Sequence, residues 1–343
     1  MMKSIQALSQ ELANTRLAAP MGRVTGISGG EIEVSGLEDQ ARIGDRLVLR
    51  RGKRDDLHGE VLAIGAENIR MLPDTAPERA SIGDAVLLFQ TPEFAPDNSW
   101  IGRVIDPFGE PLDGKPMLGG VDSRDLMASP PKAAARRGLG KRLSTGLAIL
   151  NTVLPIVTGQ RIGLFAGSGV GKSTLMAQLA ENMEADVVVM ALIGERGREV
   201  NHFVKEVLGP EGMKRAVVVA ATSDQSALVR RRCAWAAMSV AEHYRDQGLN
   251  VLFMADSITR FAEAHREIAV ASGEAPALRG FPPSVTPLIT GLCERAGPGS
   301  DGQGDITAVF SVRVAGSDMD EPIADILRGV LDGHIVLNRE IAE

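Results

Sequence analysis

Apolar and polar residues alternate between residues 21 and 90, in short runs separated by glycine and aspartate. A period of two places every second side chain on the same face, which predicts strands with one buried side. Turn residues recur about every ten positions, a spacing typical of small closed barrels. We therefore predict a β-barrel domain over residues 19–92. The runs that support it lie at residues 23–26, 31–34, 46–49, 59–62 and 85–88.

The pattern changes after residue 145, where the apolar runs become unbroken and rich in β-branched residues. Continuous apolar character is typical of strands buried on both faces of a mostly parallel sheet, with helices between them. We predict an α/β core over residues 93–343 with this kind of sheet. The predicted strands lie at residues 161–165, 187–193, 216–221, 251–255 and 306–314.

The first residues of the chain show a third pattern. Ile5, Leu8 and Leu12 have the spacing of one face of a helix, which predicts a helix over residues 1–18. A lone short helix is marginally stable in water. We therefore expect this helix to dock on a partner protein.

Length and composition limit the class of protein. A chain of 343 residues is too long for one small core, in keeping with two domains. No apolar run approaches the ~20 residues that a membrane-spanning helix needs, and Lys3, Glu11 and Arg16 interrupt the region where a signal peptide would lie. Cys233 and Cys293 lack metal-binding spacing and are expected to be buried thiols. We expect a cytoplasmic protein.

Charge limits the choice of ligand. The formal net charge is −7, so a site for an anionic ligand must be local. Between residues 21 and 90 there are nine Lys and Arg against twelve Asp and Glu, and Phe89 is the one aromatic residue. Nucleic-acid binding by a barrel needs a basic groove and aromatic stacking platforms, so we expect none here. The run Arg230, Arg231, Arg232 is expected on a solvated helix face.

The strongest chemical signal is at residues 164–174, where an apolar strand enters a glycine-rich turn that ends in Gly-Lys-Ser and opens a helix. In such a phosphate-binding loop the backbone N–H groups surround the phosphates, the lysine contacts the β- and γ-phosphates, and the serine hydroxyl binds Mg²⁺. Ala166 stands where the usual pattern has its first glycine. The predicted nucleotide-binding residues are Gly167, Ser168, Gly169, Val170, Gly171, Lys172, Ser173 and Thr174.

Hydrolysis of ATP needs further charged groups near the phosphates, and these should follow the strand ends. Asp256 ends an apolar strand and is the predicted second Mg²⁺ ligand, with Ser173. Glu195 follows another strand and is the predicted general base or water-orienting group. Arg196 and Arg260 are predicted to compensate charge on the transferred phosphoryl group, alongside Lys172. The predicted cofactors are therefore ATP and Mg²⁺.

Taken together, these residues resemble the catalytic subunit of the rotary-ATPase-like hexamers, and most closely the type III export ATPases. The resemblance extends from about residue 20 to the end of the chain, and the flagellar branch resembles it more closely than the virulence injectisome branch. Ala166 matches the loop of the export branch. The other matching segments are residues 101–106, 109–114, 194–200, 279–285, 321–325 and 331–337.

The resemblance implies an N-terminal β-barrel followed by a RecA-like core with ATP at the subunit interfaces of a homohexamer. It implies export of flagellar proteins from chaperone–substrate complexes at an export gate, at the inner face of the cytoplasmic membrane, with a stator-like regulatory partner on the N-terminal helix. In the family an arginine-finger segment and a C-terminal helical domain follow the point where this sequence ends. We therefore expect impaired turnover and hexamer formation.

Three alternatives remain open beside the injectisome ATPase. A hexameric RNA translocase shares the barrel and core, but the acidic, aromatic-poor barrel argues against it. A non-catalytic nucleotide-binding subunit is disfavoured by Glu195, because non-catalytic relatives lack a carboxylate there. A proton-coupled rotary-ATPase subunit is disfavoured by Ala166 and by the Pro-Pro-Ser segment at residues 282–284.

Overall fold

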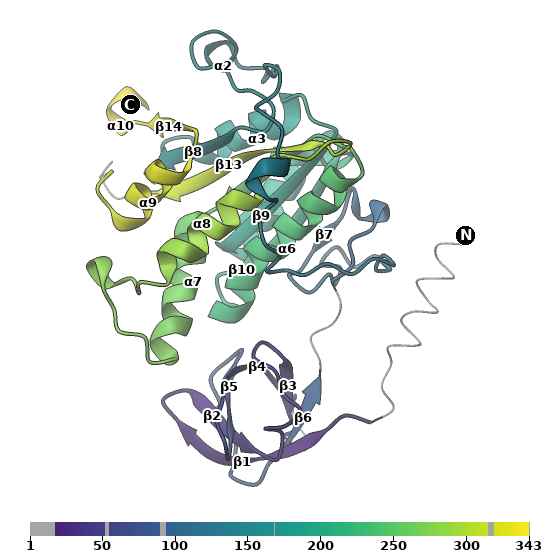
Figure 1. Cartoon of the computed structure of the whole chain (residues 1–343), viewed down its shortest axis with the longest axis vertical. Coiled ribbons are helices and arrows are strands. Elements are labelled where there is room, and N and C mark those ends of the chain that lie inside the picture. Colours follow the sequence, from purple (N-terminus) through teal and green to yellow (C-terminus); the bar gives the residue numbers. More distant parts are fainter. Residues whose placement is uncertain (1–17, 52–54, 90–93, 168, 315–318, 343) are drawn as a thin grey trace.

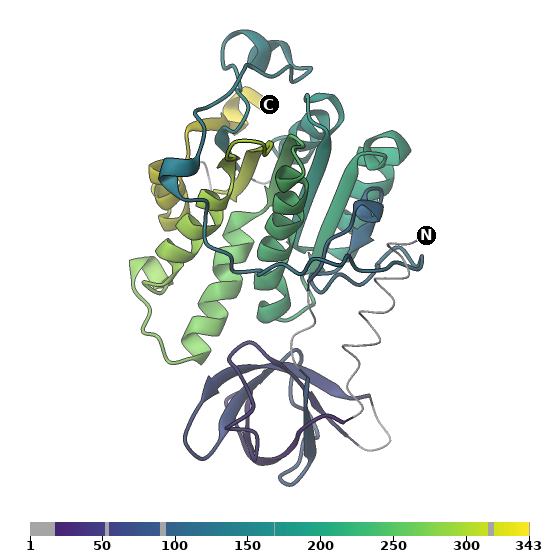
Figure 2. The ribbon, with the colours of Figure 1, turned by 45° about the vertical axis from the view of Figure 1, so that its right-hand side comes forward.

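The computed structural model describes residues 18–51, 55–89, 94–167, 169–314 and 319–342. The predicted helix at residues 1–18 and the predicted ligand Ser168 therefore lie outside the described residues, except for Ala18. The described chain forms a β-barrel and a larger α/β core, and the barrel lies at one end of the molecule (Figure 1 and Figure 2). This confirms the predicted fold class.

The barrel is closed, because its first strand pairs with both the second and the last. Its antiparallel order is β1-β2-β5-β4-β3-β6. Alternate residues fill the interior, as on β2, where Ile32 and Val34 are buried. The strands are β1 (Met21–Ser28), β2 (Glu31–Ser35), β3 (Arg46–Leu49), β4 (Leu57–Ile64), β5 (Ile69–Pro73) and β6 (Ala85–Phe89).

The core is built on a sheet whose order is β14-β8-β13-β11-β9-β10-β7, with β12 paired to β13. All of these pairings are parallel except that of β12. The strands that the apolar runs predict are all present. The bounds are β7 (Val104–Ile105), β8 (Arg161–Ala166), β9 (Val187–Glu195), β10 (Ala216–Thr222), β11 (Val251–Asp256), β12 (Gly297–Pro298), β13 (Asp305–Arg313) and β14 (Gly333–Leu337).

Helices cover both faces of this sheet (Figure 1). Alternate residues of β9 contact opposite layers: Val187 and Val189 pack with α6, α7 and α8, whereas Val188 and Met190 pack with α3. Unbroken apolar strands are therefore required, as the sequence indicates. The α-helices are α2 (Ala148–Thr152), α3 (Lys172–Asn182), α4 (Gly197–His202), α5 (Gly209–Met213), α6 (Ala227–Asp246), α7 (Ile258–Ala271), α8 (Val285–Arg295), α9 (Pro322–Val330) and α10 (Arg339–Ala342).

Shorter helical segments complete the core. A π-helical turn, η3 (Phe203–Leu208), continues α4, and 3₁₀ turns form η1 (Asn98–Trp100), η2 (Ala133–Ala135) and η4 (Leu278–Gly280). Among the described residues, no helix is both long and apolar enough to span a bilayer. Cys233 and Cys293 are fully buried, as expected.

The prediction that the three consecutive arginines of α6 lie on a solvated face is wrong. Arg230 donates to Glu267 at 2.7 Å, and its side chain is 13% exposed. Arg231 and Arg232 are largely buried where the barrel meets the core, and burial lowers the pKa of Arg232 to about 10. Arg232 stacks over the Phe108 ring at 4.7 Å, and Arg46 of the barrel lies over the same ring at 4.9 Å. A run of three charged residues indicates a solvated helix face only when no second domain covers that face. Here the barrel covers it.

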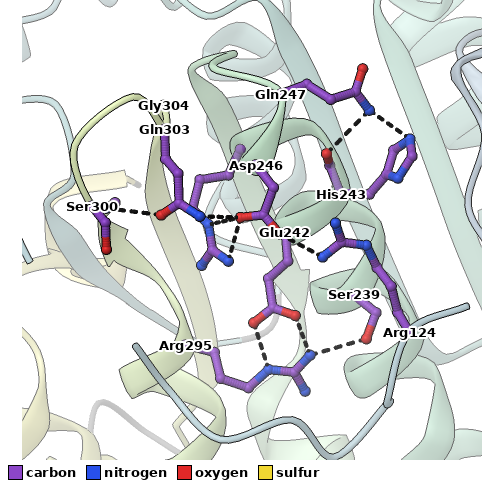
Figure 3. Close-up of polar contacts among 12 residues, drawn as sticks. Arg124, Ser239, Glu242, His243, Asp246, Gln247, Arg295, Ser300, Gln303 and Gly304 are labelled. Carbon is purple, nitrogen blue, oxygen red and sulfur yellow. Dashed lines mark hydrogen bonds and ion pairs between the residues drawn. The ribbon is translucent and has the colours of Figure 1, made fainter. Parts of the chain in front are cut away.

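A buried ion pair joins two helices of the same face. Arg295 of α8 donates to both carboxylate oxygens of Glu242 on α6, at 2.9 and 2.7 Å, and to Ser239. Figure 3 shows this pair beneath a more exposed set in which Asp246 bonds both Arg124 and Gln303. These contacts tie the connecting segment around residue 124 to the core.

Candidate active site

The phosphate-binding loop lies where the sequence places it, between the end of β8 at Ala166 and the start of α3 at Lys172. Gly169 and Gly171 have φ of 79° and 91°, in the left-handed region that glycine adopts without strain. The N-cap residue of α3 is Gly171, which has no side chain, and no other described residue caps this helix. The first N–H groups of this helix therefore have no side-chain acceptor at the cap position, as an anion-binding loop requires.

A cavity of about 710 Å³ opens in front of this loop at the carboxyl edge of the sheet. It brings together residues from the loop, from the ends of β9, β10 and β13, and from α7. These are the positions where ligands bind in open α/β sheets. The lining residues are Gly167, Gly169, Gly171, Lys172, Ser173, Thr174, Gly194, Glu195, Arg196, Glu199, Ser223, Arg260 and Arg313.

The two predicted metal ligands lie together beside this cavity. Ser173, Asp256 and Glu195 all line an adjoining cavity of about 330 Å³. Lys172 Nζ and Ser311 Oγ both donate to Oδ1 of Asp256, the latter at 2.8 Å. In the part of the chain that the structure describes, Oδ2 of Asp256 has no hydrogen-bond partner, so one carboxylate oxygen is available to a cation or to its water.

Glu195 is partly buried at the end of β9, and its pKa is raised. Burial, the nearby charge of Asp256 and a hydrogen bond with Glu199 raise the pKa of Glu195 to about 7, against the opposing effect of Lys172. The same hydrogen bond, with the charge of Arg196, lowers the pKa of Glu199. A carboxyl group that titrates near neutral pH is suited to proton transfer.

The two predicted arginines both face the cavity but differ in their surroundings. Arg196 is 68% exposed and donates to Glu199 at 3.0 Å. Arg260 donates to Glu263 at 2.7 Å through Nη1, while its Nε is buried and has no partner among the described residues. An unpartnered buried N–H is costly unless a ligand accepts from it. The structure thus brings the described candidate residues to one site, although Val170 of the loop lines neither cavity.

Sequence reasoning missed several residues of this site. Gly194 has a φ of 68°, and a side chain there would contact Arg230 and Arg260. Ser311 holds Asp256 from the neighbouring strand, and a serine within a buried strand gives no sequence signal. Arg313 ends β13, so the rule that located Asp256 and Glu195 could have located it too.

Together, the parallel α/β sheet, the loop after β8 and the acidic residues at neighbouring strand ends define a P-loop nucleotide-binding protein. Residues 146–343 match the nucleotide-binding domain of the ATP synthase alpha/beta family. The chain belongs to this family. Over 323 residues it is 44% identical to the flagellum-specific ATP synthase of Agrobacterium fabrum, covering 94% of this chain and 68% of that protein.

Two solved structures share the fold at high similarity. The assembled ATPase EscN from the type III secretion system of enteropathogenic E. coli matches with a TM-score of 0.84 and 39% identity, covering 94% of this chain and 76% of that one. The same ATPase in complex with its central stalk EscO matches with a TM-score of 0.83 and 39% identity, with the same coverage. The type III export resemblance in the sequence is thereby confirmed.

Proposed function

We propose that this chain hydrolyses ATP to energise flagellar type III protein export. The observation that supports hydrolysis best is the position of Glu195, which lines the same cavity as Lys172 and Ser173 of the phosphate-binding loop. A protein that only holds nucleotide has no need for a carboxyl group of raised pKa at this position.

The donor set fits a magnesium–nucleotide complex. Lys172, Arg260 and the loop N–H groups are suited to phosphate oxygens, and the unpartnered Nε of Arg260 lies at the cavity. Ser173 and Asp256 supply oxygen ligands of the kind that Mg²⁺ prefers, directly or through water. When bound, Mg²⁺ neutralises charge on the β- and γ-phosphates.

The residues divide the work of hydrolysis. Lys172 holds the phosphates, and in doing so it exchanges its contact with Asp256 for one with the nucleotide. Glu195, once ionised, orients the attacking water and accepts its proton. Arg196 and Arg260 compensate the charge that spreads over the transferred phosphoryl group.

The flagellar assignment rests on the identities. Flagellum-specific ATP synthases are 41–45% identical to this chain over nearly all of its length, whereas two type III secretion ATPases are 39% and 43% identical, the latter over 73% of the chain. We propose that rapid hydrolysis requires a homohexamer, because the similar structure of EscN is that of an assembled ATPase. We also propose a location at the inner face of the cytoplasmic membrane. We further propose that residues 1–18 bind a stator-like partner and that the protein receives chaperone–substrate complexes at the export gate.

The test measures phosphate release from Mg²⁺–ATP at increasing protein concentration, for the full chain and for Glu195→Gln. Hydrolysis that depends on both Mg²⁺ and Glu195 supports the proposal. Equal rates for the two proteins favour a non-catalytic nucleotide-binding subunit, and stimulation by single-stranded RNA favours a translocase. Restored motility in a host that lacks its own flagellar ATPase distinguishes flagellar from injectisome export.

A further inference from the structure

Arg313 ends β13, the strand that lies between the two strands carrying the nucleotide-binding groups. On one side β13 pairs with β8, and Arg313 is in register with Ala166, the residue before the phosphate-binding loop. On the other side β13 pairs with β11, which ends at Asp256. The backbone of Arg313 therefore emerges between the loop and the predicted metal ligand.

The base of this side chain is held firmly. The backbone N–H of Arg313 donates to Oγ1 of Thr259 at 2.9 Å, and Thr259 lies in the first turn of α7, next to Arg260. The following N–H, that of Val314, donates to the carbonyl oxygen of Ala166 at 3.1 Å. Hydrogen bonds thus fix the backbone at Arg313 to both β8 and α7, the helix that bears Arg260.

The guanidinium of Arg313 has no carboxylate partner among the described residues. The other cations that line the cavity each contact a carboxylate: Lys172 contacts Asp256, Arg196 contacts Glu199, and Arg260 contacts Glu263. Arg313 also lines the cavity and is exposed, although the rest of its strand is buried. Its guanidinium makes no hydrogen bond or ion pair with any residue that the structure describes.

We propose that Arg313 is a phosphate-binding residue whose guanidinium contacts the terminal phosphate of the bound nucleoside triphosphate. The terminal phosphate must lie within reach of Lys172, of the cation held by Asp256 and of the water held by Glu195. The end of β13 is the sheet position between these groups. A planar guanidinium matches the paired oxygens of a phosphate. This inference rests on the proposed function, because it needs the cavity to hold a triphosphate.

The test compares the affinities of the full chain for fluorescent mant-AMPPNP and mant-ADP, both with Mg²⁺. Arg313→Gln should weaken binding of the triphosphate analogue about tenfold or more, the loss expected for a charge-assisted hydrogen bond, and leave that of the diphosphate nearly unchanged. Arg313→Lys should give an intermediate loss, because it keeps the charge without the fork. Arg328→Gln, an exposed position on α9 outside the cavity, is the matched control.

Each outcome separates the inference from the function. Selective loss of triphosphate binding, with an unchanged melting temperature, supports a contact with the terminal phosphate. If Arg313→Gln weakens the binding of both nucleotides equally, the inference is overturned and the proposed function stands. The same holds if Arg313→Gln weakens neither while the wild type binds ATP. Failure of the wild-type chain to bind either nucleotide overturns both.

Discussion

Lys172 at the start of α3 donates a hydrogen bond to Asp256 at the end of β11. In the sheet, β11 is separated by one strand, β13, from β8, the strand that leads into the loop of Lys172. Both side chains are largely buried, with exposed fractions of 14% and 10%. Each is therefore the counter-ion of the other, and binding of a magnesium–nucleotide complex supplies both with a new partner: phosphate for the lysine and the metal or its water for the aspartate.

This relationship predicts the effect of removing the lysine. Lys172→Ala should weaken binding of Mg²⁺–ATP at least tenfold, because hydrogen bonds to charged groups contribute about 1.5–3 kcal/mol. Titration with a fluorescent ATP analogue measures the loss. Lys214→Ala is the control, since Lys214 is 69% exposed and contacts Glu211 on the surface. Unchanged affinity in the Lys172 variant would place the nucleotide elsewhere.

Glu195→Gln should separate binding from turnover. The amide keeps the shape of the side chain but cannot accept a proton from water, so the rate of hydrolysis should fall by about 10²–10⁴-fold. Affinity for ATP should stay close to that of the wild type. Phosphate release under single-turnover conditions measures the rate. Glu181→Gln, an exposed position on α3, carries the same chemical change outside the cavity. A near-normal rate in the Glu195 variant contradicts the assigned role.

The raised pKa of Glu195 predicts two pH dependences. In the folded protein the group ionises near pH 7, whereas its ordinary value is 4.5. The unfolded chain therefore releases this proton first, and the nucleotide-free wild type should lose stability relative to Glu195→Gln as pH rises from about 4.5 to 7. Urea unfolding at pH 5 and pH 8 measures the difference. The reaction needs the ionised base, so kcat/KM should rise through about pH 7.

The sequence predicted the parts of the site that depend on local pattern. Asp256 and Glu195 each follow an apolar run, and parallel strands bring their carboxyl ends to one edge. The phosphate-binding loop before Lys172 can be recognised from its glycine-rich sequence alone. These inferences need no knowledge of which helix packs on which strand.

The residues that the sequence did not reveal depend on tertiary packing. The charge pattern predicts that Arg232 is solvated, yet the barrel buries it against Phe108. Ser311 gains its role only because β13 lies beside β11, and strand order cannot be read from an isolated apolar run. Arg313 is a different case, because it does not depend on tertiary packing. It lies inside the predicted strand 306–314, and the strand-end rule locates it once the strand is known to end at residue 313.

Gly194→Ala should affect turnover more than stability. The φ of 68° at Gly194 costs a non-glycine residue about 1–2 kcal/mol. Relief of this strain by rotation of the backbone moves the adjacent Glu195, so hydrolysis should fall. Gly273→Ala is the matched control, because Gly273 has a φ of 90° and does not line the cavity. Urea unfolding and phosphate release measure the two effects. Equal turnover in the two variants contradicts the positioning argument.

The ion pair of Arg295 and Glu242 predicts a large effect on stability away from the active site. Both side chains are almost fully buried, at 2% and 5% exposure. Arg295→Met should therefore cost about 3–5 kcal/mol, because it leaves the Glu242 charge without a partner in a low-dielectric interior. The cost should arise from the stranded carboxylate more than from the loss of an attraction.

The double variant Arg295→Met with Glu242→Leu distinguishes these causes. Replacing both charges by apolar side chains removes the stranded carboxylate, so the double variant should recover most of the lost stability. Urea unfolding of the wild type, the single variant and the double variant completes the comparison. The exposed pair Lys214 and Glu211 serves as the control, since its disruption should cost under about 1 kcal/mol. A double variant as unstable as the single one would show that the pair contributes its attraction directly.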